Sequence, residues 1–428
     1  MTLEAGAGTE PPKERREPAP VSRGFITLYV LALLGTYLAV MTPLLVSLAV
    51  HLEQIDEARK ETNLGLVIGV GTFVNIVAGP VIGRLSDLTT GRWGRRRPWI
   101  VAGMPIMVGG MLVIAGAGNA GMVLAGYAIG QVGISCIMTG LLAMLPDQVP
   151  EAQRGKVSGF AGFTAQIAGV IGFQAANALD GSPYLMFGVP ALLCCVLVLV
   201  AVLVLPDPVP EAASAKARRS GFDLREILLG FVFDPRRHPD MGWTWMGRFL
   251  MQFSLMFLST YQLYFLTDHL DYELDEVTGL LALTGGVGLV MTSGGAVLSG
   301  LLSDRLGRRK AFVYAAGTLF AAGFLLVATA PSFLQVFLGS QLILLGAGVF
   351  GAVDLAIVTD VIPDRDTQAA RYMSIFGIAS ALPQSAAPVV APLILALGGG
   401  ENYPLLFTVA AAIAITAGLT VRPIKGVR

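Results

Sequence analysis

Twelve long apolar runs follow one another along this chain, and they limit its fold more than any other feature. An α-helix of about 20 residues crosses the ~30 Å hydrocarbon core of a bilayer, so each run predicts one membrane-spanning helix. The runs do not alternate apolar with polar residues, as the strands of an outer-membrane barrel would. The expected spans are residues 25–50, 64–84, 99–118, 122–145, 157–179, 184–205, 243–267, 277–301, 311–330, 333–359, 372–396 and 403–421. The predicted fold class is therefore an all-α integral membrane protein.

The composition excludes a soluble protein. Only 14% of the 428 residues are charged and 54% are hydrophobic, and the mean hydropathy is +0.69. A chain this apolar cannot cover its surface with polar groups, so lipid must be its main solvent. The formal net charge of zero gives no basic surface for nucleic acid, and we expect no such partner.

The distribution of lysine and arginine predicts the orientation. If both termini are cytoplasmic, 26 of the 29 lysines and arginines fall in cytoplasmic segments, and only Arg59 and Lys60 fall outside. A bias of this size favours an even number of spans and a multi-pass protein of the inner (plasma) membrane. The outside segment after the seventh span then carries five acids and no base: Asp268, Asp271, Glu273, Asp275 and Glu276.

The spans form two related halves of six. Gly83-Arg-Leu-Ser-Asp87 recurs in the second half as Gly300-Leu-Leu-Ser-Asp304, and Asp147-Gln-Val-Pro150 recurs at nearly the same offset as Asp360-Val-Ile-Pro363. Shared landmarks in the same order indicate a duplicated six-helix unit. The expected divisions are a disordered cytoplasmic tail over 1–24, a six-helix bundle over 25–205, a cytoplasmic linker over 206–242, a second bundle over 243–421 and a cytoplasmic tail over 422–428.

The repeated loops resemble those of a known family. The first motif continues into Gly94-Arg-Arg-Arg97 and the second into Gly307-Arg-Arg-Lys310. This paired pattern resembles the signature loop of the major facilitator superfamily, and the long first copy ending Arg-Arg-Arg-Pro-Trp is similar to the sucrose-transporter and glycoside–pentoside–hexuronide symporter branch. The resemblance implies two six-helix bundles that move a solute by alternating access.

The charges of these loops predict a gating latch on the cytoplasmic face. A carboxylate at one helix end, beside arginines at the next helix start, can bind in one conformation and release in another. The alternative is that the arginines only set topology and stay among lipid headgroups. The expected latch residues are Gly83, Asp87, Gly94, Arg95, Arg96, Arg97, Gly300, Asp304, Arg308 and Arg309.

Two ionisable residues, Arg248 and Asp354, lie inside the predicted spans. A charged group there costs about 2.5–3.5 kcal/mol even on lenient scales, so each is a candidate functional residue. Both lie about six residues from a cytoplasmic helix end, which puts them at a matched depth of ~9 Å. In the resembled fold the seventh and tenth helices border the central cavity. We expect the two to pair, either as a switch that exchanges a proton or cation or as a static structural pair.

Polar side chains within the spans are further candidates for solute contact. On the seventh span, Gln252, Ser259 and Gln262 fall within about 40° of Arg248 at 100° per residue, so they share one face. Amides, hydroxyls and tyrosines suit a polyhydroxylated ligand, whereas the alternative is hydrogen bonding between helices. The remaining candidates are Gln131, Ser135, Tyr37, Gln174 and Asn177.

An enzyme is not expected. The three histidines are scattered, and the sequence has no nucleophile–base spacing, metal-ligand cluster or phosphate-binding loop. We therefore expect no metal and no cofactor beyond a coupling proton or sodium ion. The predicted function is secondary active transport of a small polar solute, a sugar or glycoside, by a monomer in the lipid bilayer. The alternatives are an efflux antiporter for a drug or natural product, and a membrane receptor or scaffold that transports nothing.

Overall fold

The computed structural model describes residues 20–89, 91–179, 181–206, 233–361, 365–397 and 401–424. Within these ranges the chain is helical apart from turns and one isolated bridge between Gly91 and Gly94. Most of the predicted N-terminal tail and of the predicted linker lie outside the described residues.

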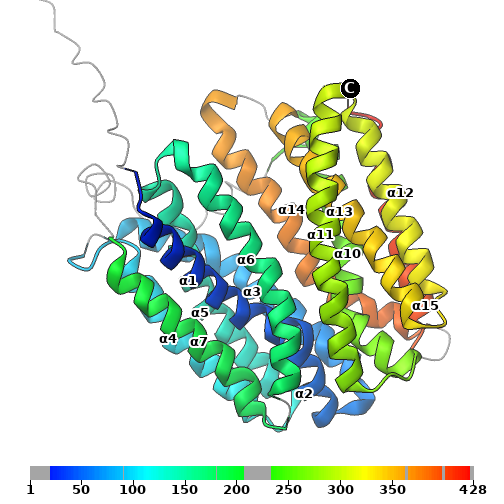
Figure 1. Cartoon of the computed structure of the whole chain (residues 1–428), viewed down its shortest axis with the longest axis horizontal. Helices are drawn as coiled ribbons and strands as arrows, with labels where there is room; N and C mark the ends of the chain where they lie inside the picture. Colours follow the sequence, from blue (N-terminus) through cyan, green and yellow to red (C-terminus); the bar gives the residue numbers. More distant parts are fainter. Residues whose placement is uncertain are drawn as a thin grey trace, which may run out of the picture.

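Within the described residues, six helical rods make up the first half of the molecule, and Figure 1 shows how they are arranged. The first rod contains a π-helical segment that begins at Pro43, whose ring nitrogen has no hydrogen to donate within the helix. The elements are α1 (Arg23–Thr42), η1 (Pro43–Ser47), α2 (Leu48–Ile55), η2 (Glu57–Arg59), α3 (Lys60–Leu88), α4 (Arg97–Ala115), α5 (Ala120–Gln148), α6 (Glu151–Ala178) and α7 (Pro183–Val204).

In the described part of the second half there are six further rods, and a π-helical segment ends the first of them. The elements are α10 (Pro239–Tyr264), η3 (Phe265–His269), α11 (Leu274–Leu306), α12 (Arg309–Ala328), α13 (Phe333–Val361), α14 (Arg365–Leu395) and α15 (Tyr403–Leu419). Each predicted span coincides with one of these rods, and the helices run past the apolar core into charged ends. Among the described residues, ten helical segments are long and apolar enough to cross a membrane, and α15 is a shorter apolar helix.

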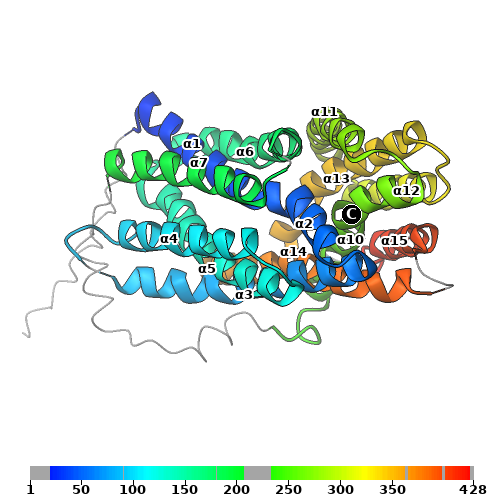
Figure 2. The ribbon, with the colours of Figure 1, turned by 90° about the horizontal axis from the view of Figure 1, so that it is seen from below.

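The two halves pack their helices in the same way. In the first half α1 contacts α6 and α7, α5 contacts α3 and α4, and α4 contacts α7. In the second half α10 contacts α14 and α15, α13 contacts α11 and α12, and α12 contacts α15. Counted from the start of each half, these are the same five pairs. Figures 1 and 2 show the result as two six-helix bundles side by side.

The repetition extends to individual glycines in the helix crossings. Gly110 on α4 faces Gly126 on α5 so closely that a Cβ on either would overlap the backbone of the other. Gly323 on α12 and Gly339 on α13 face each other in the same way, and both follow their counterparts in the first half at one common offset. Small residues let membrane helices approach backbone to backbone. The duplication predicted from the loops is therefore present inside the bundles.

The halves meet at one end of the molecule and diverge toward the other (Figure 1). We call the end where α1 begins and α15 ends the terminal end, and the opposite end the loop end. Between the halves, α3 packs against α14 and α6 against α11. Near the loop end, Ser385 Oγ donates to Gly69 O at 2.6 Å and Tyr264 Oη donates to Ala49 O at 2.8 Å. The structure is thus closed at the loop end.

Candidate functional site

An ion pair joins α10 to α13 in the second half. Arg248 Nε donates to Asp354 Oδ2 at 2.6 Å, and Nη2 of the same guanidinium contacts the same oxygen. The two side chains are 14% and 7% exposed. The pair predicted from matched depth therefore forms, and it is largely shielded from solvent.

Arg248 also contacts α14. Its Nη1 donates to Phe376 O at 3.4 Å, and its guanidinium carbon lies 5.4 Å from the centre of the Phe376 ring. One guanidinium thus connects three helices of the second half. In a low-dielectric interior, a charge that loses its partner is costly. A substitution of Asp354 will therefore disturb the packing of all three helices.

An aromatic row lies beside the predicted polar face of α10. Trp245 stacks on Phe249 with ring centres 5.4 Å apart, and Phe253 follows 5.7 Å beyond Phe249. At 100° per residue, Trp245 and Phe249 lie about 60° and 100° from Arg248 around the helix. All three rings are partly exposed. This row is not among the residues predicted from the sequence, although aromatic residues at every fourth position of one span indicate it.

The predicted polar face of α10 divides into groups with different contacts. Gln262 Nε2 donates to Ser340 Oγ on α13 at 3.3 Å, so it links two helices. Ser259 Oγ donates to Leu255 O of its own helix at 3.2 Å. Gln252 is half-buried one turn from Arg248.

The candidates on α5 are engaged between helices. Asn75 Nδ2 on α3 donates to Gln131 Oε1 at 2.9 Å, and Ser135 Oγ donates to Asn75 O at 3.5 Å. Both α5 side chains are buried, as the hydrogen-bonding alternative expects. Thr292 and Leu344 form the corresponding contact between α11 and α13 of the second half.

Three further candidates are not brought to this region by any described contact. Tyr37 is half-buried on α1, and Gln174 is exposed on α6. The side chain of Asn177 lies outside the described side chains.

The first loop forms an ionic cluster at the terminal end of the first half. Arg95 Nη2 lies 2.7 Å from Asp87 Oδ1, and Arg96 Nη1 lies 2.8 Å from the same oxygen. Arg96 Nε also contacts Asp147 Oδ2 at 3.4 Å. Because Arg96 is buried, the cluster ties the end of α3, the start of α4 and the end of α5 together. It lies within one half, so it stiffens that bundle.

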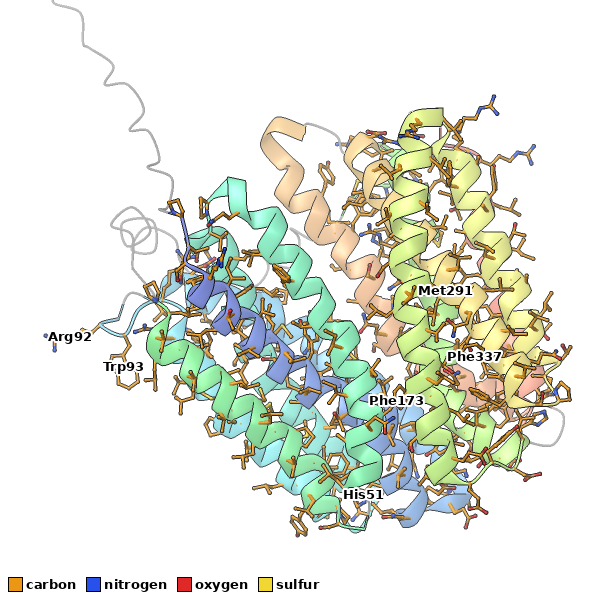
Figure 3. The ribbon with its side chains drawn as sticks, viewed as in Figure 1. His51, Arg92, Trp93, Phe173, Met291 and Phe337 are labelled. Carbon is orange, nitrogen blue, oxygen red and sulfur yellow. The ribbon has the colours of Figure 1, made fainter. Side chains whose placement is uncertain are left out.

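The backbone of this loop requires Gly94. Its φ of +98° lies in the left-handed region that side chains avoid. The turn leaves Arg92 and Trp93 projecting from the bundle (Figure 3), and Trp93 is 69% exposed. Arg97 donates to Leu205 O and so attaches the start of α4 to the end of α7.

The second loop repeats part of the cluster. Arg309 pairs with Asp360 and donates to Ala356 O at 3.0 Å. Arg309 follows Arg96 at the same offset at which Asp360 follows Asp147, so the two ion pairs occupy equivalent places. The side chain of Asp304 lies outside the described side chains, Arg308 is exposed, and Gly300 is half-buried on α11, as Gly83 is on α3.

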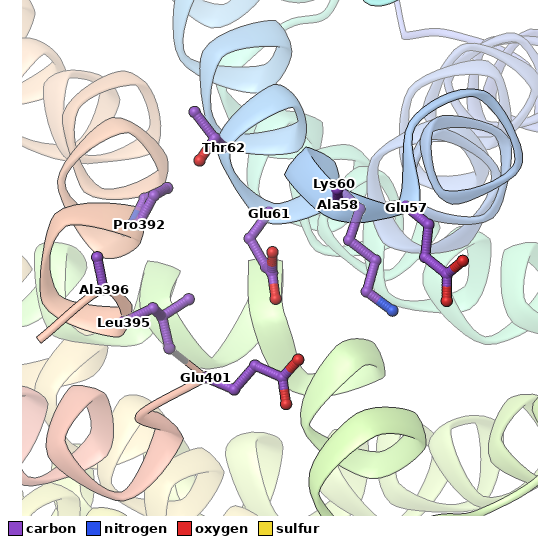
Figure 4. Close-up of a pocket in the computed structure, with 9 residues that line it drawn as sticks. All are labelled: Glu57, Ala58, Lys60, Glu61, Thr62, Pro392, Leu395, Ala396 and Glu401. Atoms are coloured by element: carbon purple, nitrogen blue, oxygen red, sulfur yellow. The ribbon is translucent and has the colours of Figure 1, made fainter. Parts of the chain in front are cut away.

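A charged cluster at the loop end is not among the sites predicted from the sequence. Lys60 lies between Glu53 of its own half and Asp268 of the other half. Beside it, a pocket of about 510 Å³ is lined by Lys60, Glu61 and Glu401, among others (Figure 4). Lys60 and Asp268 are 208 positions apart, and no local pattern in the sequence relates them.

Several of these residues are carboxylates, which can also bind metal ions. Within the ranges that the structure describes, no three His, Cys, Asp or Glu side chains come together as a metal site needs.

Comparison with known proteins gives the family. The Major Facilitator Superfamily model matches residues 24–301 and 292–426. Among curated proteins, an uncharacterised symporter of Synechocystis is 48% identical over 40 residues, but that match takes in only 9% of this chain and 7% of the symporter.

Solved transporters share the fold. The nucleoside transporter NupG has a TM-score of 0.73 at 13% identity, covering 94% of this chain and 100% of NupG. A bacterial homologue of the human lysosomal transporter Spinster, in an inward-facing unoccupied conformation, has a TM-score of 0.69 at 13% identity, covering 94% and 96%. The human organic anion transporter MFSD10 has a TM-score of 0.66 at 19% identity, covering 94% and 100%. The chain therefore belongs to the major facilitator superfamily and is a membrane transporter, not an enzyme.

Proposed function

We propose that this transporter moves a small polar solute, a sugar or glycoside, across the plasma membrane by alternating access, in symport with a proton or a sodium ion. The proposal includes a cytoplasmic position for both termini, which follows from the lysine and arginine distribution. It also takes the monomer as the working unit, since each chain has both halves that alternating access needs.

The Arg248–Asp354 pair carries the proposal. An ion pair at this depth costs desolvation energy that a pair of apolar side chains would not. The presence of such a costly pair favours a role in coupling. When a proton or sodium ion neutralises Asp354, the attraction between Asp354 and Arg248 weakens. The five donors of the guanidinium can then turn toward an incoming solute. Cation binding and solute binding would thus be linked through one side chain.

The surroundings of Arg248 support a sugar-like solute. A sugar ring has apolar faces and hydroxyl edges, so it pairs well with aromatic rings next to amides. The row formed by Trp245, Phe249 and Phe253 offers partly exposed ring surface beside Gln252. The resemblance of the first loop to the glycoside–pentoside–hexuronide branch supports a glycoside, and the short match to a symporter supports coupling to a cation.

The closed loop end supports alternating access. With cytoplasmic termini, a molecule closed at the loop end is in its inward-facing arrangement. Two equivalent contacts join the halves, because α3 packs against α14 and α6 packs against α11. Rocking of the halves about these contacts would open the loop end and close the terminal end.

Transport into proteoliposomes tests the proposal. Purified protein is reconstituted and offered a panel of radiolabelled glycosides and sugars, with an inward proton gradient, an inward sodium gradient or neither. The proposal expects accumulation of at least one glycoside that depends on one gradient. Expulsion of apolar drugs instead would favour the antiporter alternative, and an absence of any solute flux would favour a receptor or scaffold.

A further inference from the structure

The cluster at the loop end joins the two halves through one lysine. Lys60 Nζ donates to Glu53 Oε1 at 2.6 Å and to Asp268 Oδ1 at 2.9 Å, and it lies 4.9 Å from the centre of the Tyr264 ring. Glu53 moves with Lys60, whereas Asp268 and Tyr264 belong to the other half. The Lys60 side chain is 9% exposed. The cross-half ion pair therefore exists only while the loop end is closed.

One hydroxyl in this cluster faces two carboxylates. Tyr403 Oη lies 3.3 Å from Glu61 Oε1 in the first half and 3.4 Å from Asp268 Oδ2 in the second. A phenol has a single hydrogen, so it can donate to only one of them. The second contact becomes a hydrogen bond when that carboxyl group carries a proton and donates it to Oη. The geometry thus provides a place for one proton.

The other charges around Glu61 also favour the binding of this proton. Lys60 is one ammonium ion among three carboxylates, because it pairs with Glu53 and Asp268 and lines the same pocket as Glu61. Like charges at such distances repel, and the repulsion falls when one is neutralised. When the loop end opens, Asp268 moves away from Glu53 and Glu61. The repulsion between the carboxylates then falls without the binding of a proton. The titratable groups that neighbouring elements contribute are Glu53 (α2), Glu57 (η2), Lys60 (α3), Tyr261 and Tyr264 (α10), Asp268 and His269 (η3), Glu401, and Tyr403 (α15).

We propose that closing the loop end takes up one proton, shared among Glu61, Tyr403 and Asp268, so that acid on the loop-end side favours the closed arrangement. When the halves part at this end, the proton returns to the same side. It therefore regulates the balance between the two arrangements and does not drive solute across the membrane. This proton goes beyond the proposed transport reaction and is independent of Asp354.

A distance measurement in liposomes without solute tests the proposal. Spin labels are attached to the full-length protein through Gln54→Cys and Thr329→Cys, which are exposed loop-end positions on opposite halves. Cys136, Cys194 and Cys195 are replaced by alanine. If one proton is taken up on closing, the ratio of closed to open molecules rises up to about tenfold for each unit by which the pH falls. Glu61→Gln carries a permanently neutral amide, so it should stay closed at every pH and lose this slope.

Two variants complete the experiment. Tyr403→Phe removes only the hydroxyl, and we expect a smaller closed fraction and a weaker pH slope. Glu57→Gln is the matched control, since it removes a carboxylate from the same pocket one turn away, and it should keep the slope of the parent protein. The proposal would be overturned if the closed fraction of the parent protein did not change with pH. It would also be overturned if the Glu61→Gln variant had the same pH slope as the parent protein. No transport is measured, so failure here is separate from failure of the proposed function.

Discussion

Arg248 and Asp354 are 106 positions apart in the sequence, yet Arg248 Nε lies 2.6 Å from Asp354 Oδ2 between α10 and α13. Neither side chain is more than 14% exposed. The pair belongs wholly to the second half, so it persists when the halves move as rigid bodies. Its breaking would need a local event, such as cation binding at Asp354.

The first prediction concerns the stability of this pair. Removing one partner of a buried ion pair costs about 3–5 kcal/mol because the other charge is left uncompensated. We expect Arg248→Gln and Asp354→Asn each to lower the unfolding temperature of the purified protein. The double variant should be more stable than either single one, because it buries no unpaired charge. Thermal unfolding of all four proteins gives the coupling, and strictly additive effects would mean that the two side chains do not interact.

The second prediction concerns the terminal-end cluster. Asp87 accepts from Arg95 and Arg96, so Asp87→Asn weakens the tie between α3 and α4. We expect the initial rate of solute uptake to fall roughly tenfold, about 1.4 kcal/mol in the barrier, with normal membrane insertion. Asp234→Asn is the control, because that carboxylate contacts Arg236 N and the exposed side chain of Arg237 within its own loop. If the initial uptake rate of Asp87→Asn were unchanged, the cluster would set only the topology of the protein.

The third prediction concerns closure of the loop end. Gly65 on α3 packs so closely on α14 that a Cβ there would overlap Pro388 O and crowd Tyr261 Oη. We expect Gly65→Val to hold the loop end open, seen as a longer distance between labels at positions 54 and 329, and to stop turnover. Gly79→Val on the same helix is the control, since a Cβ there meets open space. Equal distances in the two variants would mean that the α3–α14 contact does not govern closure.

The fourth prediction concerns the glycine crossing of α4 and α5. A Cβ at Gly110 would overlap the backbone of α5, whereas a Cβ at its neighbour Gly109 meets nothing. Because overpacking of a filled contact costs about 1–3 kcal/mol, Gly110→Val should lower the unfolding temperature and Gly109→Val should not. Thermal unfolding in detergent distinguishes them, and similar losses in both variants would contradict the close crossing.

Much of the fold could be predicted from the sequence because the bilayer leaves few choices. Each span must satisfy its own backbone hydrogen bonds, so length and apolarity alone indicate the helices. The cost of a buried charge singles out Arg248 and Asp354, and helix rise gives their common depth. The shared order of the loop motifs likewise indicates a duplication, which the matching ion pairs of Arg96 with Asp147 and Arg309 with Asp360 bear out.

The contacts of the polar side chains could not be predicted in the same way. Helical periodicity gives the face on which Gln131 and Ser135 lie, but it does not say whether that face meets solute or another helix. In the structure it meets Asn75 of α3. The Lys60–Asp268 pair depends on how two halves close, and closure is a property of tertiary packing that no local pattern carries. The charges within the spans could therefore be predicted from the sequence, whereas the charges that join the halves could not.

Gradient-driven glycoside accumulation in proteoliposomes is the most direct test of the central claim that Asp354, paired with Arg248, couples solute movement to a cation. The parent protein and Asp354→Asn are compared for accumulation under an inward proton or sodium gradient and for exchange of the same solute without a gradient. We predict that the parent accumulates a glycoside under one gradient, and that Asp354→Asn retains exchange but loses accumulation. Accumulation by Asp354→Asn at the parent level would contradict the claim.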